Sequence, residues 1–290
     1  MYSLVGERSA DAEEASGLLD RDGEALWCRL EASGLHAAYS HPDRRHRNTE
    51  PSQSRSLQFD PSWPSREGSL ISMANHEVTS ACRALVDNAP LLRHPFFQFI
   101  AEESDLAKRS LLRWLQLDWI VARDFTTLAF ALGAVSKNMS VRHVLSRNLW
   151  DEFGNGKISR AHFTSYVALM RSVGADEPQG YSTSEFLELQ RSICSRSEIE
   201  GLAVFCYANE YLCLAEFPPI AASFERNFPS HDRRYFRELI VDHRHTRELE
   251  DVLVSVCDGS EGEIRRLETA LQAVLDAREA IYDEVTSSLA

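Results

Sequence analysis

The stretch that decides the fold is Tyr235 to Val252, which reads Tyr-Phe-Arg-Glu-Leu-Ile-Val-Asp-His-Arg-His-Thr-Arg-Glu-Leu-Glu-Asp-Val. On a helix, at about 100° per residue, Glu238, Asp242 and His245 fall within about 60° of one another. Tyr235 and Leu249 lie on the same stripe, so we expect this face to meet the core. An unpaired charge on such a face is costly, and a bound cation is the simplest way to offset that cost.

The bulk composition limits the class of protein. The chain has 290 residues, of which 43% are hydrophobic, enough for one large domain or one domain with an appendage. The net charge of −13 argues against nucleic acid or an anionic membrane as a partner. No Cys-x-x-Cys pair, basic-then-apolar leader or membrane-length apolar run is visible. These features favour a reducing cytoplasm.

We expect two regions along the chain. Residues 1–72 should form an N-terminal extension, with one amphipathic helix followed by a Pro-, Ser- and Arg-rich linker. Residues 73–290 show helical periodicity, and strand-like alternation never lasts for six residues. We therefore predict an all-α bundle in residues 73–290. The expected helices are 76–88, 93–103, 105–133, 141–152, 158–174, 183–194, 196–217, 231–257 and 261–288.

Two more helical segments place polar side chains on an inward face. Glu210 shares a face with Phe217, and His162 follows a turn, residues 154–156, that starts just after Glu152. The glycines of that turn allow Glu152 and His162 to converge from consecutive helices. With the opening stretch, this makes an oxygen-rich, two-histidine set that suits iron or manganese better than zinc or calcium. Facing helices that present such ligands are typical of di-iron carboxylate proteins.

Each of these positions also has a structural interpretation. A lone buried histidine is more often a hydrogen-bonded core residue than a ligand, and a lone buried glutamate is commonly paired with an arginine such as Arg123 or Arg244. The glycine turn by itself is a helix C-cap. The coincidence of three inward-facing segments is what favours a metal site.

The run Asn148-Leu149-Trp150-Asp151-Glu152-Phe153-Gly154-Asn155-Gly156, followed by His162, resembles the first metal motif of the heme-oxygenase-like di-iron oxidases. These enzymes share a helical scaffold with heme oxygenase, thiaminase and the pyrroloquinoline-quinone synthase. Several members have Glu-x9-His, which Glu152 and His162 match, and the single later Glu is matched by Glu210. The last motif, His-x3-Asp-x2-His, has glutamate in place of its first histidine here. The resemblance covers about residues 90–257.

This resemblance implies a heme-oxygenase-like helical bundle whose two irons, or one iron and one manganese, activate O2 to oxidise a small organic substrate such as an amino acid or a fatty acid. The implied metal ligands are Glu152, His162, Glu210, Glu238, Asp242 and His245. The glutamate at 238 adds charge, which favours manganese, shifts the redox potential or leaves one metal position weak or empty. Helix 105–133 should pack across the helices that carry these implied ligands. The expected substrate-binding residues are therefore Trp119, Arg123, Tyr166 and Tyr207, with Phe125 as a further pocket candidate. Arg123 would pair with a substrate carboxylate or form a structural salt bridge.

Two other functions stay open. A metal-free, thiaminase-like hydrolase would use Cys206 or Cys213 as its nucleophile, activated by Glu210. A non-catalytic helical module would use the inward polar groups as a buried hydrogen-bond network. A homodimer is compatible with the resemblance, since members often dimerise, and the sequence does not choose the substrate.

Overall fold

A computed structural model of the chain describes residues 70–178, 184–237 and 239–289, with side chains from residue 77 onward except those of 239–242. The N-terminal extension and its linker were predicted for residues that lie almost entirely outside these ranges. Within them every regular element is a helix, as predicted for an all-α bundle. No helix in this part of the chain is both long and apolar enough to cross a membrane.

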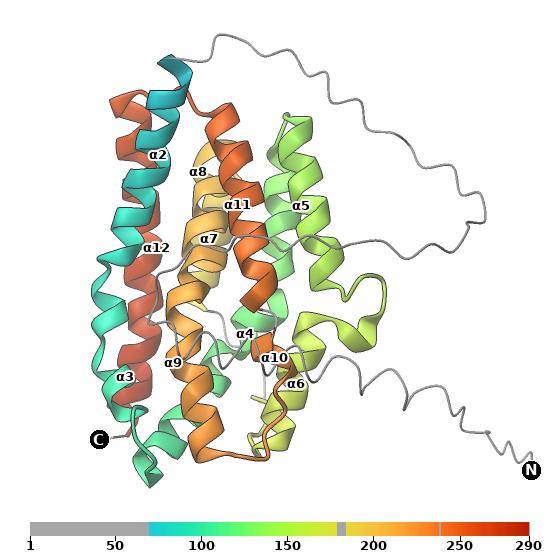
Figure 1. Cartoon of the computed structure of the whole chain (residues 1–290), viewed down its shortest axis with the longest axis vertical. Helices are drawn as coiled ribbons and strands as arrows, with labels where there is room; N and C mark the ends of the chain where they lie inside the picture. Colours follow the sequence, from blue (N-terminus) through green and yellow to red (C-terminus); the bar gives the residue numbers. More distant parts are fainter. Residues whose placement is uncertain (1–69, 179–183, 238, 290) are drawn as a thin grey trace, which may run out of the picture. The chain divides into compact units, whose positions relative to one another are not determined.

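The helices follow one another along the chain as drawn in Figure 1. They are α2 (Leu70–Asp87), η2 (Pro90–Arg93), α3 (Pro95–Phe99), α4 (Asp105–Val135), α5 (Met139–Glu152), η3 (Ile158–Arg160), α6 (His162–Ser172), α7 (Glu185–Cys194), α8 (Glu198–Phe205), the π-helix η4 (Cys206–Tyr211), α9 (Leu212–Asn227), α10 (Arg234–Arg237), α11 (Leu239–Val256) and α12 (Glu261–Ser287). The helix expected at 93–103 is present only as the short helix α3, which follows the 3-10 turn η2. The segment expected as a single helix at 158–174 is divided into the 3-10 turn η3 and helix α6.

Helix α4 is the longest helix of the bundle and shows why these residues fold as they do. It begins at Ser104, whose side-chain oxygen accepts a hydrogen bond from the backbone N–H of Ala107 at 3.0 Å. Its apolar stripe, which includes Leu111, Trp114 and Leu128, is fully buried. The helix packs against α5, α6, α7, α9 and α12, so it forms the inner wall of the bundle.

Helix α11 brings α5 and η4 together, because it contacts both of them. Helix α12 packs along α2, α4 and α8 (Figure 1). The last residue of α5, the middle of η4 and the middle of α11 are therefore brought close together, although they are far apart in sequence. This arrangement positions the candidate site.

One predicted helix end is wrong. The helix expected over 196–217 ends just before Pro218 and Pro219, which cannot donate a backbone hydrogen bond, but α9 runs through both prolines to Asn227. Proline in a helix interior removes a backbone donor and costs about 3 kcal/mol. Burial of Phe217 and Phe224 against the ring of Trp114, at centroid distances of 6.1 and 6.3 Å, offsets that cost.

Candidate metal centre

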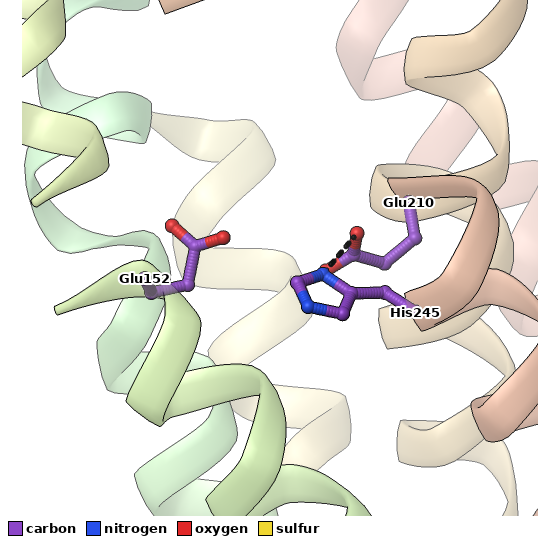
Figure 2. A group of neighbouring side chains, drawn as sticks. All are labelled: Glu152, Glu210 and His245. Carbon is purple, nitrogen blue, oxygen red and sulfur yellow. Dashed lines mark hydrogen bonds and ion pairs between the residues drawn. The ribbon is translucent and has the colours of Figure 1, made fainter. Parts of the chain in front are cut away.

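Three side chains from three helices converge on one point (Figure 2). Glu152 is the last residue of α5, Glu210 lies in the π-helix η4, and His245 lies in α11. One ligand atom from each lies within 4.8 Å of the ligand atoms of the other two. The residues are 9%, 3% and 2% exposed, so their charges are shielded from water. Two carboxylates and an imidazole at this spacing form a candidate metal-binding group.

A tight turn places Glu152 in this group. Gly154, Asn155 and Gly156 follow it with φ values of 67°, 55° and 79°, in the left-handed region that favours glycine. A Cβ atom on Gly154 would lie 2.5 Å from backbone atoms of Lys157 and Arg160. Only glycine fits there, and the turn returns the chain to start α6 at His162.

His162 lies beside the group and contacts it through Glu152. Its Nδ1 is 3.1 Å from Oε2 of Glu152, and its ring packs against Tyr235 with centroids 4.7 Å apart and the ring planes tilted by 34°. This is the convergence of Glu152 and His162 that the glycine turn predicts. His162 does not belong to the three-residue group found within 4.8 Å in the part of the chain that the structure describes.

The other two expected ligands cannot be placed. Glu238 lies outside the described residues, and Asp242 falls within α11 but its side chain is not described. Their role in binding metal stays a prediction, as does the effect of glutamate at position 238.

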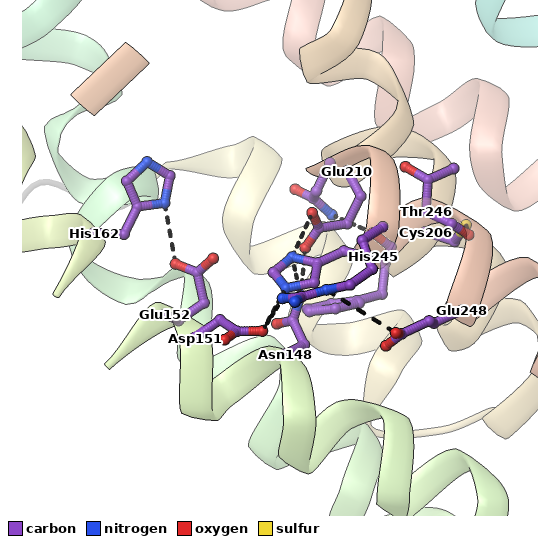
Figure 3. A network of polar contacts seen from close by, with 12 residues as sticks. Asn148, Asp151, Glu152, His162, Cys206, Glu210, His245, Thr246 and Glu248 are labelled. Atoms are coloured by element: carbon purple, nitrogen blue, oxygen red, sulfur yellow. Dashed lines mark hydrogen bonds and ion pairs between the residues drawn. The ribbon is translucent and has the colours of Figure 1, made fainter. Parts of the chain in front are cut away.

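A hydrogen-bond network surrounds His245 (Figure 3). The side-chain nitrogen of Asn148 is 2.7 Å from Oε1 of Glu210 and 3.0 Å from Nδ1 of His245. The other ring nitrogen, Nε2, lies 3.1 Å from Oδ2 of Asp151, which also pairs with Arg244. Sequence reasoning assigned no role to Asn148 or Asp151, although both stand in the quoted metal motif. Asn148 and Asp151 precede Glu152 by four positions and one position on the same helix, and this closeness could have indicated that they lie near the site.

The carboxylates decide the charge of His245. Burial lowers the pKa of His245, but hydrogen bonds and charges from Glu210 and Asp151, with the charge of Glu152, outweigh burial and raise this pKa to about 9. In the metal-free protein at neutral pH the imidazole therefore carries a proton. A metal bound to His245 has to displace that proton.

Neither protonation state of Nδ1 of His245 suits both of its hydrogen-bonding neighbours. Nδ1 of His245 faces both the amide nitrogen of Asn148 and Oε2 of Glu210, the latter at 3.2 Å. When Nδ1 is protonated it opposes the amide N–H, and when it is neutral it opposes the carboxylate lone pairs. The side-chain oxygen of Asn148 is buried without a hydrogen-bond partner. A cation between the imidazole and the carboxylates would remove the conflict, and donors of this kind suit iron.

A cavity of about 70 Å³ adjoins the group. At about 10–15 Å³ for each water molecule, it has room for roughly five of them, or for a chain of a few heavy atoms. The wall includes Glu152, His162 and Glu210, and also a second charged group that the sequence analysis did not find. The lining residues are Asp118, Val121, Ala122, Phe125, Glu152, His162, Phe163, Phe186, Ala208, Asn209, Glu210, Cys213, Glu216, Phe217, Tyr235 and Arg278.

Of the residues that we expected around a substrate, Phe125 lines the cavity and the other four stand outside its wall as the structure describes it. Tyr166 packs behind Tyr235 at 4.9 Å, and its hydroxyl donates to the carbonyl of Leu115. Trp119 packs behind Phe163, also at 4.9 Å.

Arg123 and Tyr207 are turned toward other neighbours. Arg123 donates two hydrogen bonds of 2.7 Å to Asp124, which is the salt bridge considered above. Tyr207 is fully buried and packs against Tyr211, on the side of η4 that meets α2.

The two candidate nucleophiles differ in their surroundings. Cys206 is fully buried, and its thiol donates to the carbonyl of Thr246 at 3.6 Å. Burial, with the charges of Glu250 and Glu210, raises the pKa of Cys206 well above its ordinary value, which suppresses the reactive thiolate. Cys213 lines the cavity, so the hydrolase alternative rests on Cys213 alone.

Comparisons with known proteins agree with this architecture. Residues 112–279 match the model of a family described as iron-containing redox enzymes. A CADD-like protein of unknown function from Nostoc punctiforme superposes with a TM-score of 0.62 at 16% identity, over 74% of this chain and 98% of that chain. A domain of unknown function with a heme oxygenase-like fold from Shewanella denitrificans gives a TM-score of 0.54 at 12% identity, over 77% and 94%. No curated protein matches the chain. The predicted heme-oxygenase-like fold is confirmed.

Proposed function

Because the chain belongs to the family of iron-containing redox enzymes, we propose that it is an O2-dependent non-heme oxidoreductase acting on a small organic substrate. It would hold two irons, or one iron and one manganese, and the substrate would be a molecule such as an amino acid or a fatty acid. The observation that carries the proposal is the buried group of Glu152, Glu210 and His245 beside a cavity.

The residues of the site have separate tasks in this proposal. Glu152, Glu210 and Nδ1 of His245 would hold the metal, and iron bound there supplies the electrons that reduce O2. Asp151 would accept a hydrogen bond from Nε2–H, which fixes the imidazole tautomer and leaves Nδ1 free for the metal. Arg244 pairs with Asp151 and would hold that carboxylate in place beside the imidazole.

The cavity wall would exclude bulk water from the reaction. The rings of Phe163, Phe217 and Tyr235 form an apolar lining beside the charged group. His162 and Glu152, 3.1 Å apart, can share a proton at the edge of the cavity.

Anaerobic titration with Fe(II), followed by exposure to O2, tests the proposal. We expect bound iron, oxygen uptake and a transient visible absorption band from the wild-type protein. Glu210→Gln should lower iron binding at least about tenfold, because it removes a buried charged ligand. Glu200→Gln is the matched control, since Glu200 of α8 is a carboxylate that pairs with Arg266 at 3.2 Å. Equal iron binding by wild type and Glu210→Gln would refute this site.

The metal-free hydrolase remains the second candidate because Cys213 lines the cavity. It predicts that Cys213→Ala abolishes turnover while iron is irrelevant. The oxidoreductase predicts that Cys213→Ala still binds iron and still takes up O2.

A further inference from the structure

The cavity wall contains a second buried charged group, formed by Asp118 of α4, Glu216 of α9 and Arg278 of α12. Nε of Arg278 donates to Oε1 of Glu216 at 2.8 Å, and Nη1 donates to Asp118. The three residues are 2%, 1% and 3% exposed. None of them belongs to the candidate metal-binding group.

The charges in this group do not balance. Two carboxylates share one guanidinium, and Arg278 is the cation with which each of them pairs among the described residues. Burial raises the pKa of Glu216 to about 7, although Arg278 opposes that rise. Near neutral pH a proton therefore compensates part of the excess negative charge. A positively charged ligand group would compensate it better, because it brings its own hydrogen-bond donors.

Arg278 itself has little capacity left for a substrate carboxylate. Its guanidinium already binds both carboxylates, and it stacks on the rings of Phe186 and Tyr282 at 5.4 and 5.6 Å from their centroids. A substrate carboxylate would have to displace one of its partners and would add a third negative charge to a buried site. The polarity of this wall therefore opposes an anionic group.

We propose that the substrate carries a cationic nitrogen group, an ammonium or a guanidinium, which binds Asp118 and Glu216 while the rest of the molecule lies toward Glu152 and Glu210. The inference rests on the proposed function and names the substrate class for that same site. Glu210 and Glu216 stand on one continuous helical run, at most roughly 9 Å apart along its axis. A short amine can therefore contact both groups.

Three probes of equal length separate the possible polarities: n-pentylamine, n-pentanol and n-pentanoate. Their binding to the full chain is measured by calorimetry under anaerobic conditions, with the protein metal-free and again with Fe(II) bound. At about pH 8 the amine is cationic and Glu216 is ionised. We expect the amine to bind at least about tenfold more tightly than the alcohol in both forms, and pentanoate to bind more weakly than either. Binding to the metal-free form shows that the amine is not simply a ligand of iron.

Two variants and one pH series locate the effect. Glu216→Gln leaves Asp118 and Arg278 as a balanced pair, so the preference for the amine over the alcohol should fall at least about fivefold. Glu225 lies on the same helix as Glu216 and is a half-buried carboxylate that pairs with Arg233. Glu225→Gln should keep the preference. In the wild type, amine binding should tighten between about pH 6 and pH 8 as Glu216 ionises, with Asp118 and Arg278 as its charged neighbours.

Several results would overturn the inference: pentanoate binding more tightly than the amine, equal binding of amine and alcohol, or full retention of the preference in Glu216→Gln. If that variant does not fold, the comparison of the three probes on the wild type still decides. Amine selectivity without iron binding would refute the proposed function and keep the cation site. Iron binding and O2 uptake without amine selectivity would refute the cation site and keep the proposed function.

Discussion

At the scale of single residues, the neighbours of His245 determine its charge. It lies between Glu210 and Asp151, and its raised pKa of about 9 follows from those carboxylates despite its burial. In the unfolded chain the imidazole titrates near about 6.5. The same side chain thus links the stability of the metal-free protein, and its affinity for metal, to pH.

The first prediction is that the free energy of unfolding of the metal-free protein falls as pH rises through about 9. The folded-state pKa is raised, so the contribution of His245 is fully present below about pH 6.5 and is lost above pH 9, with an upper limit of about 3 kcal/mol. Urea unfolding at a series of pH values measures it. His245→Gln should flatten the decline, while His243→Gln, an exposed position on the same helix, should not.

Iron affinity should change in the opposite direction over the same range. Because metal displaces the proton of His245, iron should bind more tightly as pH approaches 9. An affinity that does not depend on pH would mean that His245 is not a ligand.

The sequence predicted part of the site at this scale. Helical periodicity placed His245 and Glu210 on inward faces, and both are buried in the structure. The same periodicity could have found Asp118 and Arg278, because Trp114 precedes Asp118 by four positions and Tyr282 follows Arg278 by four. They were missed because an isolated charge on an apolar stripe does not show which distant charge will meet it.

At the scale of elements, the π-helix η4 and the glycine turn after α5 set the geometry of the site. A π-turn places one extra residue in a helix and changes which side chains share a face, and such turns are frequent at functional sites. With η4, both Glu210 and Glu216 line the cavity, while Tyr207 is not part of its wall. A strict period of 3.6 residues could not have predicted this, since nothing in the apolar pattern marks the insertion.

The second prediction concerns the turn. Gly154→Ala should destabilise the protein by more than about 2 kcal/mol and sharply lower iron binding, since the new Cβ would meet backbone atoms at 2.5 Å that cannot move independently. Gly174→Ala is the matched control. Its φ is also positive, at 72°, but nothing lies within 4 Å of the new Cβ. It should cost about 1 kcal/mol and leave iron binding unchanged. Thermal unfolding and iron content measure both variants, and equal effects would contradict the steric explanation.

The prolines of α9 show how packing overrides a local signal. Sequence reasoning ended the helix at Phe217, because proline removes backbone donors. The structure extends the helix because the residues on either side of the prolines are buried against α4. Local propensity predicts where a helix is weak, whereas burial decides whether it continues.

At the scale of the whole molecule, Arg278 joins three helices through charges that are almost fully buried. It links α12 to α4 through Asp118 and to α9 through Glu216. The sequence predicted the bundle and most of its helices, because helix existence depends on periodicity within one segment. It could not predict which helices share a charged contact, since that depends on how the segments pack.

The third prediction follows from this arrangement. Arg278→Met should lower the free energy of unfolding by about 3–5 kcal/mol, because it leaves two buried carboxylates without a counter-charge. Arg113→Met is the control, since Arg113 also links α4 to α12, pairing with the exposed Glu284 at 2.6 Å. A half-exposed pair of this kind contributes about 0–1 kcal/mol. Denaturant unfolding compares the two variants, and a small effect at Arg278 would mean that protons neutralise the carboxylates.

Glu152, Glu210 and His245 come from three helices that are far apart in sequence. A metal bound to all three would therefore affect how the bundle opens locally. A metal held by all three would act as a cross-link that closes two long loops of the chain. Fraying of α5, η4 or α11 would then require a ligand to leave the metal, so the opening of each helix would carry part of the cost of releasing the ion. The three helices would exchange their backbone amide hydrogens slowly and as one unit when metal is bound, and independently when it is removed.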